Sequence, residues 1–112
     1  MHDLYVGLMS GTSVDSVDAV VVDFSKNKIN ILKQDCYEIP YLIKKEILDN
    51  TKSSTINKKE ITRLDKELGE LFSRIINDLL KKTNLNHKQI KAIGSHGQTI
   101  KHSPNSKPPF SL

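Results

Sequence analysis

The sequence predicts an α/β fold with a mixed sheet: an antiparallel meander of three strands, crossover helices, and then a parallel fourth strand. Three apolar segments of strand length occupy residues 4–9, 17–24 and 29–39. A long amphipathic segment at residues 61–80 follows them, and another short apolar segment comes at 90–95. A strand that returns after a helical crossover usually runs parallel to its neighbour, which predicts the mixed sheet.

The first three predicted strands differ in their apolar patterns. The first, residues 4–9, meets the second, 17–24, through a stretch of small residues. The second is nearly continuously apolar, which predicts a strand covered on both faces. A polar turn at 25–28 leads to the third strand, 29–39, whose imperfect alternation predicts one face partly exposed to water.

Two helices are predicted between the third and fourth strands. Pro40 predicts the start of a short helix, because its missing N–H costs nothing in a first turn. A polar link at 49–55 follows, and Asn57 and Glu60 then fit a capping box. The long helix after the box ends near residues 83–84, and its three- and four-residue apolar spacing predicts a core-facing side. The apolar side of the short helix is Leu42, Ile43, Ile47 and Leu48, and that of the long helix is Ile61, Leu64, Leu68, Leu71, Phe72, Ile75, Ile76, Leu79 and Leu80.

The end of the chain has weaker signals. Residues 90–95 predict the fourth strand, and Gly97 breaks it. Three prolines between residues 103 and 109 predict a loop.

Composition excludes several classes of protein. No apolar run reaches 18 residues, so we predict no membrane span or membrane partner. The N-terminus lacks a secretory pattern, and the single cysteine, Cys36, fits a reducing cytoplasm. In a strand, Cys36 is expected to be a small core residue.

The net charge of +4 comes mainly from lysines mixed with acidic residues. Aromatic content is 5% and tryptophan is absent, so platforms for base stacking are scarce. We therefore favour a solvated lysine-rich surface over a nucleic-acid partner.

The first motif joins the first two strands. Gly11, Thr12 and Ser13 form a turn of small residues whose N–H and hydroxyl groups can hold an anion, most often a phosphate. Asp15 and Asp18 follow, and they suit a site that also holds Mg²⁺ or a donor hydroxyl. The alternative is an ordinary hairpin turn. No Walker lysine follows, so the segment is not a Walker loop. A strand rather than a helix comes next, so it is not a dinucleotide-binding fingerprint either.

The second motif, Gly94 to Thr99, follows the carboxyl end of the fourth predicted strand, where α/β sheets usually place ligand contacts. Histidine, glutamine and threonine are neutral groups that can bind sugar hydroxyls and amides. His96 is the leading candidate for a sugar contact. The alternatives are an ordinary polar turn, or a His96 hydrogen bond that shapes the loop. His96 and His102 have no spacing typical of zinc ligands.

Both motifs resemble those of the anhydro-N-acetylmuramic acid kinases, within the actin/sugar-kinase/Hsp70 superfamily. The resemblance rests on GLMSGTSVDSVDAV at 7–20 and IGSHGQTI at 93–100, and it spans essentially the whole chain. Members of this family are much longer. The resemblance therefore implies that residues 1–112 are an incomplete N-terminal part of an actin-like ATPase (ribonuclease H-like) domain, with the second domain absent.

The resemblance implies an ATP-dependent phosphotransferase of peptidoglycan amino-sugar recycling. Such an enzyme converts 1,6-anhydro-N-acetylmuramate and water to N-acetylmuramate 6-phosphate, with ATP and Mg²⁺. The implied partners are these small molecules, and a homodimer of the full-length protein is left open. The family's general base is an aspartate in a later segment, so no catalytic residue is expected in this chain, which should be inactive alone.

Site residues follow from the same resemblance. The implied cofactor-binding residues are Gly11, Thr12, Ser13, Val14, Asp15, Ser16, Val17 and Asp18. The implied substrate-binding residues are Ser95, His96, Gly97, Gln98 and Thr99. Asp15 and Asp18 would either orient Mg²⁺ through water or fix the loop. The family usually has glycine at Ser16, where serine would be strained if the position needs a positive φ.

Two other functions stay open at this point. One is a different sugar or acid kinase of the same superfamily, which a panel of sugars would reveal. The other is a non-catalytic remnant that folds without activity.

Overall fold

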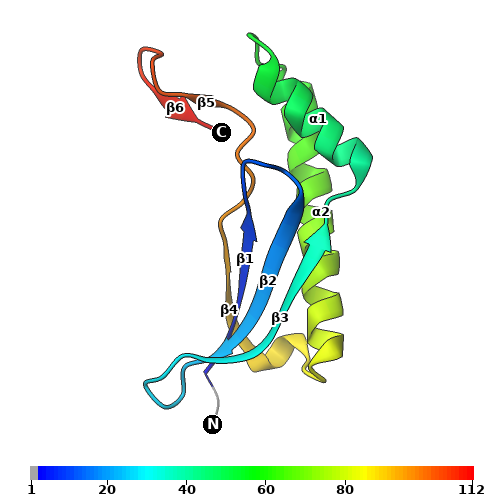
Figure 1. Cartoon of the computed structure of the whole chain (residues 1–112), viewed down its shortest axis with the longest axis vertical. Coiled ribbons are helices and arrows are strands. Elements are labelled where there is room, and N and C mark those ends of the chain that lie inside the picture. The colour runs from blue at the N-terminus through cyan, green and yellow to red at the C-terminus, as the bar shows by residue number, and fades with distance from the viewer. Residues whose placement is uncertain (1–2) are drawn as a thin grey trace.

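Strand β1 (Leu4–Ser10) lies inside a four-stranded sheet, between β2 (Ser16–Asp23) and β4 (Ile90–Ser95), and β3 (Asn30–Glu38) forms the edge beyond β2 (Figure 1). This computed structural model describes residues 3–112. β1, β2 and β3 form an antiparallel meander, and β4 runs parallel to β1. The predicted α/β class and mixed sheet are confirmed.

Two helices connect β3 to β4. Helix α1 (Tyr41–Lys52) packs against α2 (Lys58–Lys82), and α2 lies along one face of the sheet (Figure 1). A short 3₁₀ helix (His87–Gln89) then leads into β4. Within residues 3–112, neither helix has the length and apolar content that crossing a bilayer needs.

The core lies between the sheet and α2. Alternate residues of β1 and β2 point toward the helix, and apolar residues of α2 recur every three or four positions to meet them. The buried side chains of this layer are Val6, Leu8, Val17, Ala19 and Val21 from the strands, and Leu64, Leu68, Leu71, Ile75 and Leu79 from α2. The core-facing stripe predicted for the long helix is thus confirmed.

Helix α1 places one predicted core residue in solvent. Ile47 is fully buried, and Ile43 and Leu48 pack partly against the core. Leu42, however, is 72% exposed, which corrects its assignment to the apolar side. Leu42 lies five positions before Ile47, so on a helix of 3.6 residues per turn the two side chains point about 140° apart. Pro40 precedes α1 and does not occupy its first turn.

Asn57 is the N-cap of helix α2 (Lys58–Lys82), as predicted, but within residues 3–112 no bond from the Asn57 N–H to the Glu60 side chain completes the predicted capping box. The Asn57 side-chain oxygen accepts hydrogen bonds from the N–H groups of Lys59 and Glu60, at 3.1 and 3.2 Å. These are two of the four N–H groups that a helix start leaves without partners. At the other end, Thr83 is the C-cap and Asn84 adopts a left-handed conformation with φ 60°.

Replacing Asn57 with alanine should lower the free energy of unfolding by about 1 kcal/mol, because two N–H groups lose their acceptor. The shift of the urea midpoint, followed by circular dichroism, measures this loss. Asn77→Ala is the matched control: Asn77 is exposed within α2, where alanine is the better helix former. Equal midpoints for the two variants would contradict the capping role.

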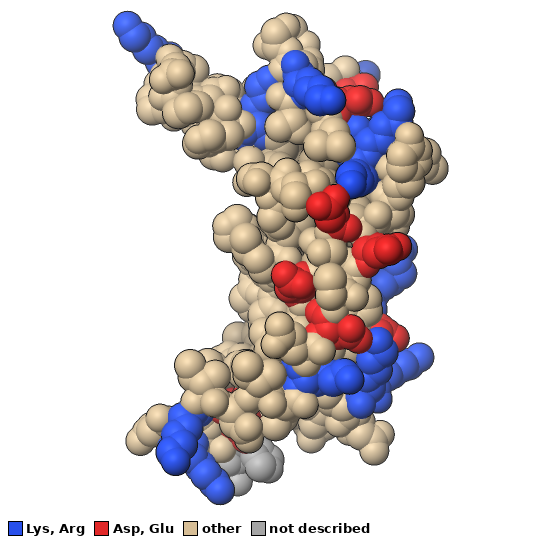
Figure 2. Space-filling model, viewed as in Figure 1, with Lys and Arg blue, Asp and Glu red and all other residues tan. Residues whose placement is uncertain are grey.

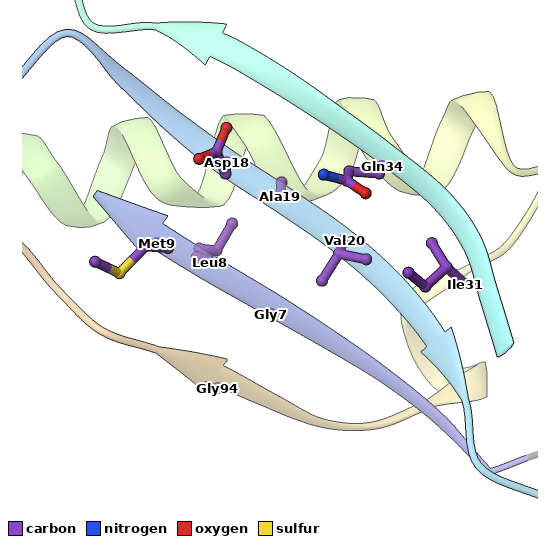
Figure 3. A pocket seen from close by; sticks show the side chains of 9 residues that line it. All are labelled: Gly7, Leu8, Met9, Asp18, Ala19, Val20, Ile31, Gln34 and Gly94. Atoms are coloured by element: carbon purple, nitrogen blue, oxygen red, sulfur yellow. The ribbon is translucent and has the colours of Figure 1, made fainter. Parts of the chain in front are cut away.

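Within residues 3–112, the sheet face opposite α2 is open, which corrects the prediction that β2 is covered on both faces. Along β2, fully buried residues alternate with half-buried or exposed ones. The open face holds a hollow of about 400 Å³, where Met9, Asp18, Val20 and Gln34 surround the bare backbone of Gly7 (Figure 3). A strand's own composition did not reveal how many layers cover the sheet.

Both edge strands are largely exposed. The pattern of β3 confirms that one of its faces is partly wet, but Cys36 is exposed, which corrects its assignment to the core. Polar contacts hold β3 to α2: the Tyr37 hydroxyl donates to Asp78 at 2.7 Å, and Lys82 pairs with Asp35 at 2.6 Å.

Lysine, arginine and acidic side chains are interspersed on the side where the helices lie, as the solvated-surface interpretation expects (Figure 2).

The proline-rich segment is more ordered than predicted. It forms the turn of a small hairpin between β5 (His102–Ser103) and β6 (Phe110–Ser111). The N–H of Leu112 donates to the Lys101 carbonyl at 2.7 Å, which extends the pairing. Prolines within the segment obscured these two-residue strands, since proline lowers any strand prediction.

Candidate active site

Loop A, residues 11–15, connects β1 to β2 at one end of the sheet. The N–H of Val14 donates to the Gly11 carbonyl at 3.2 Å and closes the turn. Thr12 and Ser13 are exposed at the tip, and no acceptor within residues 3–112 takes their N–H groups. Loop A therefore presents two N–H donors and the Thr12 hydroxyl to solvent, as an anion site requires.

Val14 carries the unusual backbone of loop A. Its φ is 56°, in the left-handed region, and its side chain is buried in the core. A β-branched residue there costs about 1–3 kcal/mol. This conformation turns Val14 inward while Thr12 and Ser13 stay outside. Ser16 starts β2 opposite Glu38 and is not among the positive-φ residues, so the family's glycine is not needed here.

Asp15 is bound within the protein. The Lys44 ammonium donates to its carboxylate at 2.6 Å from helix α1, and the Asp15 carbonyl accepts from the Ile39 N–H at 3.2 Å. The hydrogen bond and charge of Lys44, with a further hydrogen bond from Ser13, hold the pKa of Asp15 below its usual value. These contacts support loop fixing, one of the two roles open to Asp15. Sequence reasoning missed Lys44, because no local pattern reveals a partner 29 residues away.

Lys44→Met should return the pKa of Asp15 to the ordinary aspartate range, because the ammonium partner is gone. The lowered pKa means that the ion pair stabilises loop A above the ordinary aspartate pKa. That stabilisation disappears as the pH falls through the folded-state pKa. Carbon-13 NMR titration of the Asp15 carboxyl measures both values. Lys45→Met, on the same helix but paired with Asp49, should leave Asp15 unchanged, and an unshifted Asp15 in Lys44→Met would contradict the pairing.

Loop B, residues 95–99, begins at the last residue of β4. The His96 N–H donates to the Leu8 carbonyl at 3.0 Å, which extends the pairing of β4 with β1. Gly97 then has φ 75°, a conformation that favours glycine, and it ends the strand as predicted. The His96 imidazole is exposed and makes no hydrogen bond within residues 3–112. The alternative of a loop-shaping imidazole bond therefore receives no support.

Gln98 joins the two loops. Its side-chain oxygen accepts a hydrogen bond from the Ser10 hydroxyl, and its amide nitrogen donates to the carbonyls of Gly11 at 3.3 Å and Thr99 at 3.0 Å. These bonds join Gln98 to Gly11 and Ser10, which precede it by 87 and 88 positions in the sequence. Sequence reasoning missed Ser10, although a polar residue in phase with buried Leu4, Val6 and Leu8 signals a need for a partner.

The other predicted site residues separate from this cluster. Val17 is completely buried in the core, so its side chain faces no ligand. Asp18 lies on the open face of the sheet beside Gln34 (Figure 3), whereas Asp15 is bound to Lys44. Among residues 3–112, no three His, Cys, Asp or Glu side chains gather as metal ligands would. Asp15 and Asp18 therefore do not fit a metal ion held by the protein alone.

Comparison with known proteins identifies the family of this chain. A model of the anhydro-N-acetylmuramic acid kinases matches residues 3–112. Curated proteins of that name are similar over nearly the whole chain: 46% identical in Shewanella denitrificans, 42% in Pasteurella multocida and 39% in Vibrio vulnificus. These matches cover 98%, 96% and 96% of this chain.

The chain spans about 30% of the length of these relatives: 30%, 29% and 29% respectively. The matched range contains both loops and every strand and helix of the sheet layer. This chain belongs to the anhydro-N-acetylmuramic acid kinase family.

Proposed function

We propose that this chain forms the phosphate-binding side of the active site of an ATP-dependent kinase that acts on 1,6-anhydro-N-acetylmuramate. One observation carries the proposal: Gln98 brings loop A, with its outward N–H groups, against loop B, with its exposed imidazole. Phosphoryl transfer depends mainly on positioning and on stabilising charge, and two adjoining polar loops can supply both.

Loop A binds the terminal phosphates of ATP in this proposal. The N–H groups of Thr12 and Ser13 and the Thr12 hydroxyl donate to phosphate oxygens, and Gly11 leaves room for close approach. The Lys44–Asp15 ion pair keeps the loop against α1. The side chains of Val14 and Val17 stay in the core, so these two residues support the loop without contacting nucleotide.

Loop B binds the sugar. His96 offers a neutral donor or acceptor for a hydroxyl or for the N-acetyl group, and Thr99 and Ser95 lie beside it in sequence. The positive φ of Gly97 turns the chain so that residues on both sides can approach one ligand.

The proposed reaction joins a ring opening to a phosphoryl transfer. Water bonds to the anomeric carbon as the bond from that carbon to the 6-oxygen breaks. The freed 6-oxygen then takes the γ-phosphoryl group, and ADP leaves. A carboxylate general base removes the proton from water, and the proposal places it outside residues 3–112.

Magnesium enters the proposal with ATP. Because Asp15 and Asp18 do not fit a protein-held ion, the phosphate oxygens of ATP would supply its ligands. Bound Mg²⁺ would neutralise charge on the transferred group.

We also propose that the whole protein is a cytoplasmic enzyme of amino-sugar recycling whose partners are small molecules, with dimerisation left open.

A chimaeric kinase tests the proposal. Residues 3–112 replace the matching segment of the Shewanella denitrificans relative, which is 46% identical to this chain. We expect ATP-dependent formation of N-acetylmuramate 6-phosphate by the chimaeric kinase and none by the 112-residue chain alone. A panel of other sugars should give no comparable ATP consumption.

The matching segment of the Vibrio vulnificus relative, placed in the same host, is the control for the exchange itself. If that control turns over substrate and the chimaeric kinase binds no ATP, the proposed function is wrong. Turnover by the 112-residue chain alone would also contradict the proposed division of the active site.

A further inference from the structure

We propose that Gln98 is a positioning residue that sets the shape of loop A, and that it does not bind the sugar. The inference rests on the proposed function, because it assigns a role within that site. It differs from the expectation for the second motif, in which Gln98 was one of five substrate-binding residues.

The amide of Gln98 is largely occupied within the protein. A glutamine side chain has two N–H donors and one oxygen with two lone pairs. Both donors have acceptors in the structure, the carbonyls of Gly11 and Thr99. The oxygen accepts from Ser10, so one lone pair is left for any ligand. A sugar could displace these bonds only by leaving protein groups without partners.

The partner of the Gln98 oxygen is a buried hydroxyl. Ser10 is 2% exposed and points to the same side of β1 as the core residues Leu8 and Val6. Within residues 3–112 the Ser10 hydroxyl donates to the Gln98 oxygen, and a buried hydroxyl without a partner would destabilise the fold. Gln98 therefore completes the polar end of the core layer.

The partner of the Gln98 nitrogen is the carbonyl that closes loop A. The Gly11 carbonyl accepts both the Val14 N–H and the Gln98 amide. The first of these bonds holds the turn that leaves Thr12 and Ser13 outside. Because Gln98 binds the same oxygen, a shift of loop B alters the orientation of the Gly11 peptide, whose other end is the Thr12 N–H.

The chimaeric kinase with Gln98→Ala should show a KM for ATP raised about tenfold and a lower kcat, with the KM for the sugar within about twofold of the parent. A contact to the sugar would give the opposite pattern. A sugar KM raised tenfold with an unchanged ATP KM would overturn the inference.

A double-mutant cycle tests the route through Ser10. Ser10→Ala and Gln98→Ala each remove the same hydrogen bond, so the double variant should resemble Gln98→Ala alone. If the fold-changes of the two single variants instead multiply in the double variant, the two residues do not share one contact. Gln34→Ala is the matched control, because Gln34 is an exposed glutamine on β3 whose side chain makes no hydrogen bond within residues 3–112. Its kinetics should equal those of the parent.

Hydrogen exchange separates this inference from the proposed function. Peptides that cover loop A should exchange faster in Gln98→Ala than in Gln34→Ala, whether or not the protein turns over substrate. If Gln98→Ala fails to fold, Gln98→Glu keeps the side-chain length and the acceptor for Ser10 but loses the donor to Gly11. Faster exchange in loop A in that variant supports the inference, and unchanged exchange overturns it.

Discussion

Replacing Thr12 with alanine in the chimaeric kinase is expected to lower kcat/KM for ATP by about 100-fold. Thr12 lies at the exposed tip of loop A, and its hydroxyl is not used within residues 3–112. In the proposed complex it donates to the transferred phosphate, where charge develops during the reaction. Steady-state kinetics with ATP varied at saturating sugar measure the loss.

The matched control for Thr12 is Thr83→Ala at the C-cap of helix α2. The Thr83 hydroxyl donates to the Leu79 and Leu80 carbonyls of its own helix at 3.1 and 3.0 Å. This end of α2 leads to the start of β4, whereas loop B follows the end of β4. Removing the hydroxyl should leave the kinetics unchanged. If Thr12→Ala behaves like Thr83→Ala, loop A does not bind the phosphates, and the proposed function loses its central contact.

The Gly11→Ala variant distinguishes an effect on phosphate binding from an effect on the folding of loop A. A methyl group at Gly11 would meet no atom within 4 Å, and the φ of Gly11 is not in the left-handed region. The fold should therefore accept it. In the proposed complex, Gly11 lies where the phosphate approaches, so the methyl group should raise the KM for ATP. A raised KM with an unchanged unfolding midpoint would point to the ligand and not to the fold.

Local patterns predicted the elements of the fold well, because each pattern depends on neighbours along the chain. The stripe of α2 and its Asn57 cap follow from spacing within one helix. The fourth strand, residues 90–95, has the predicted bounds because Gly97 ends it in a conformation that favours glycine. The meander follows from short polar links between apolar runs.

Features that depend on distant neighbours were predicted poorly. Val20 and Val22 made β2 appear covered on both faces, but within residues 3–112 the helical layer, in which α2 contacts β2 and β3, lies on one face of the sheet. Cys36 and Leu42 are exposed for the same reason, since apolar character does not say whether a layer exists to cover it.

The features of the candidate site were also predicted only in part. The sequence predicted two polar loops, and resemblance placed them in one site. It did not predict that Val14 would carry the left-handed conformation, because such a conformation for valine has no local signal. Nor did it predict Lys44 as the partner of Asp15. Ser10 could have been found, because its alternation with Leu8 marks a buried hydroxyl.

His96→Ala in the chimaeric kinase is expected to raise the KM for the anhydro sugar at least about tenfold and to leave the KM for ATP nearly unchanged. The imidazole is exposed and has no hydrogen-bond partner within residues 3–112, so its loss should not disturb the fold. His96 itself holds loop B through its N–H, which donates to the Leu8 carbonyl, and alanine keeps that bond. Kinetics with the sugar varied at saturating ATP measure the change.

Two further variants make the His96 test specific. His96→Gln keeps a neutral donor and acceptor and should recover part of the affinity for the sugar, whereas a purely steric role would give no recovery. His87→Ala is the matched control, because His87 is exposed on the 3₁₀ helix at the opposite end of β4. An unchanged sugar KM in His96→Ala would remove loop B from the sugar site. Since Gln98 should move the KM for ATP and His96 that for the sugar, the two variants together test whether neighbouring residues of one loop serve different substrates.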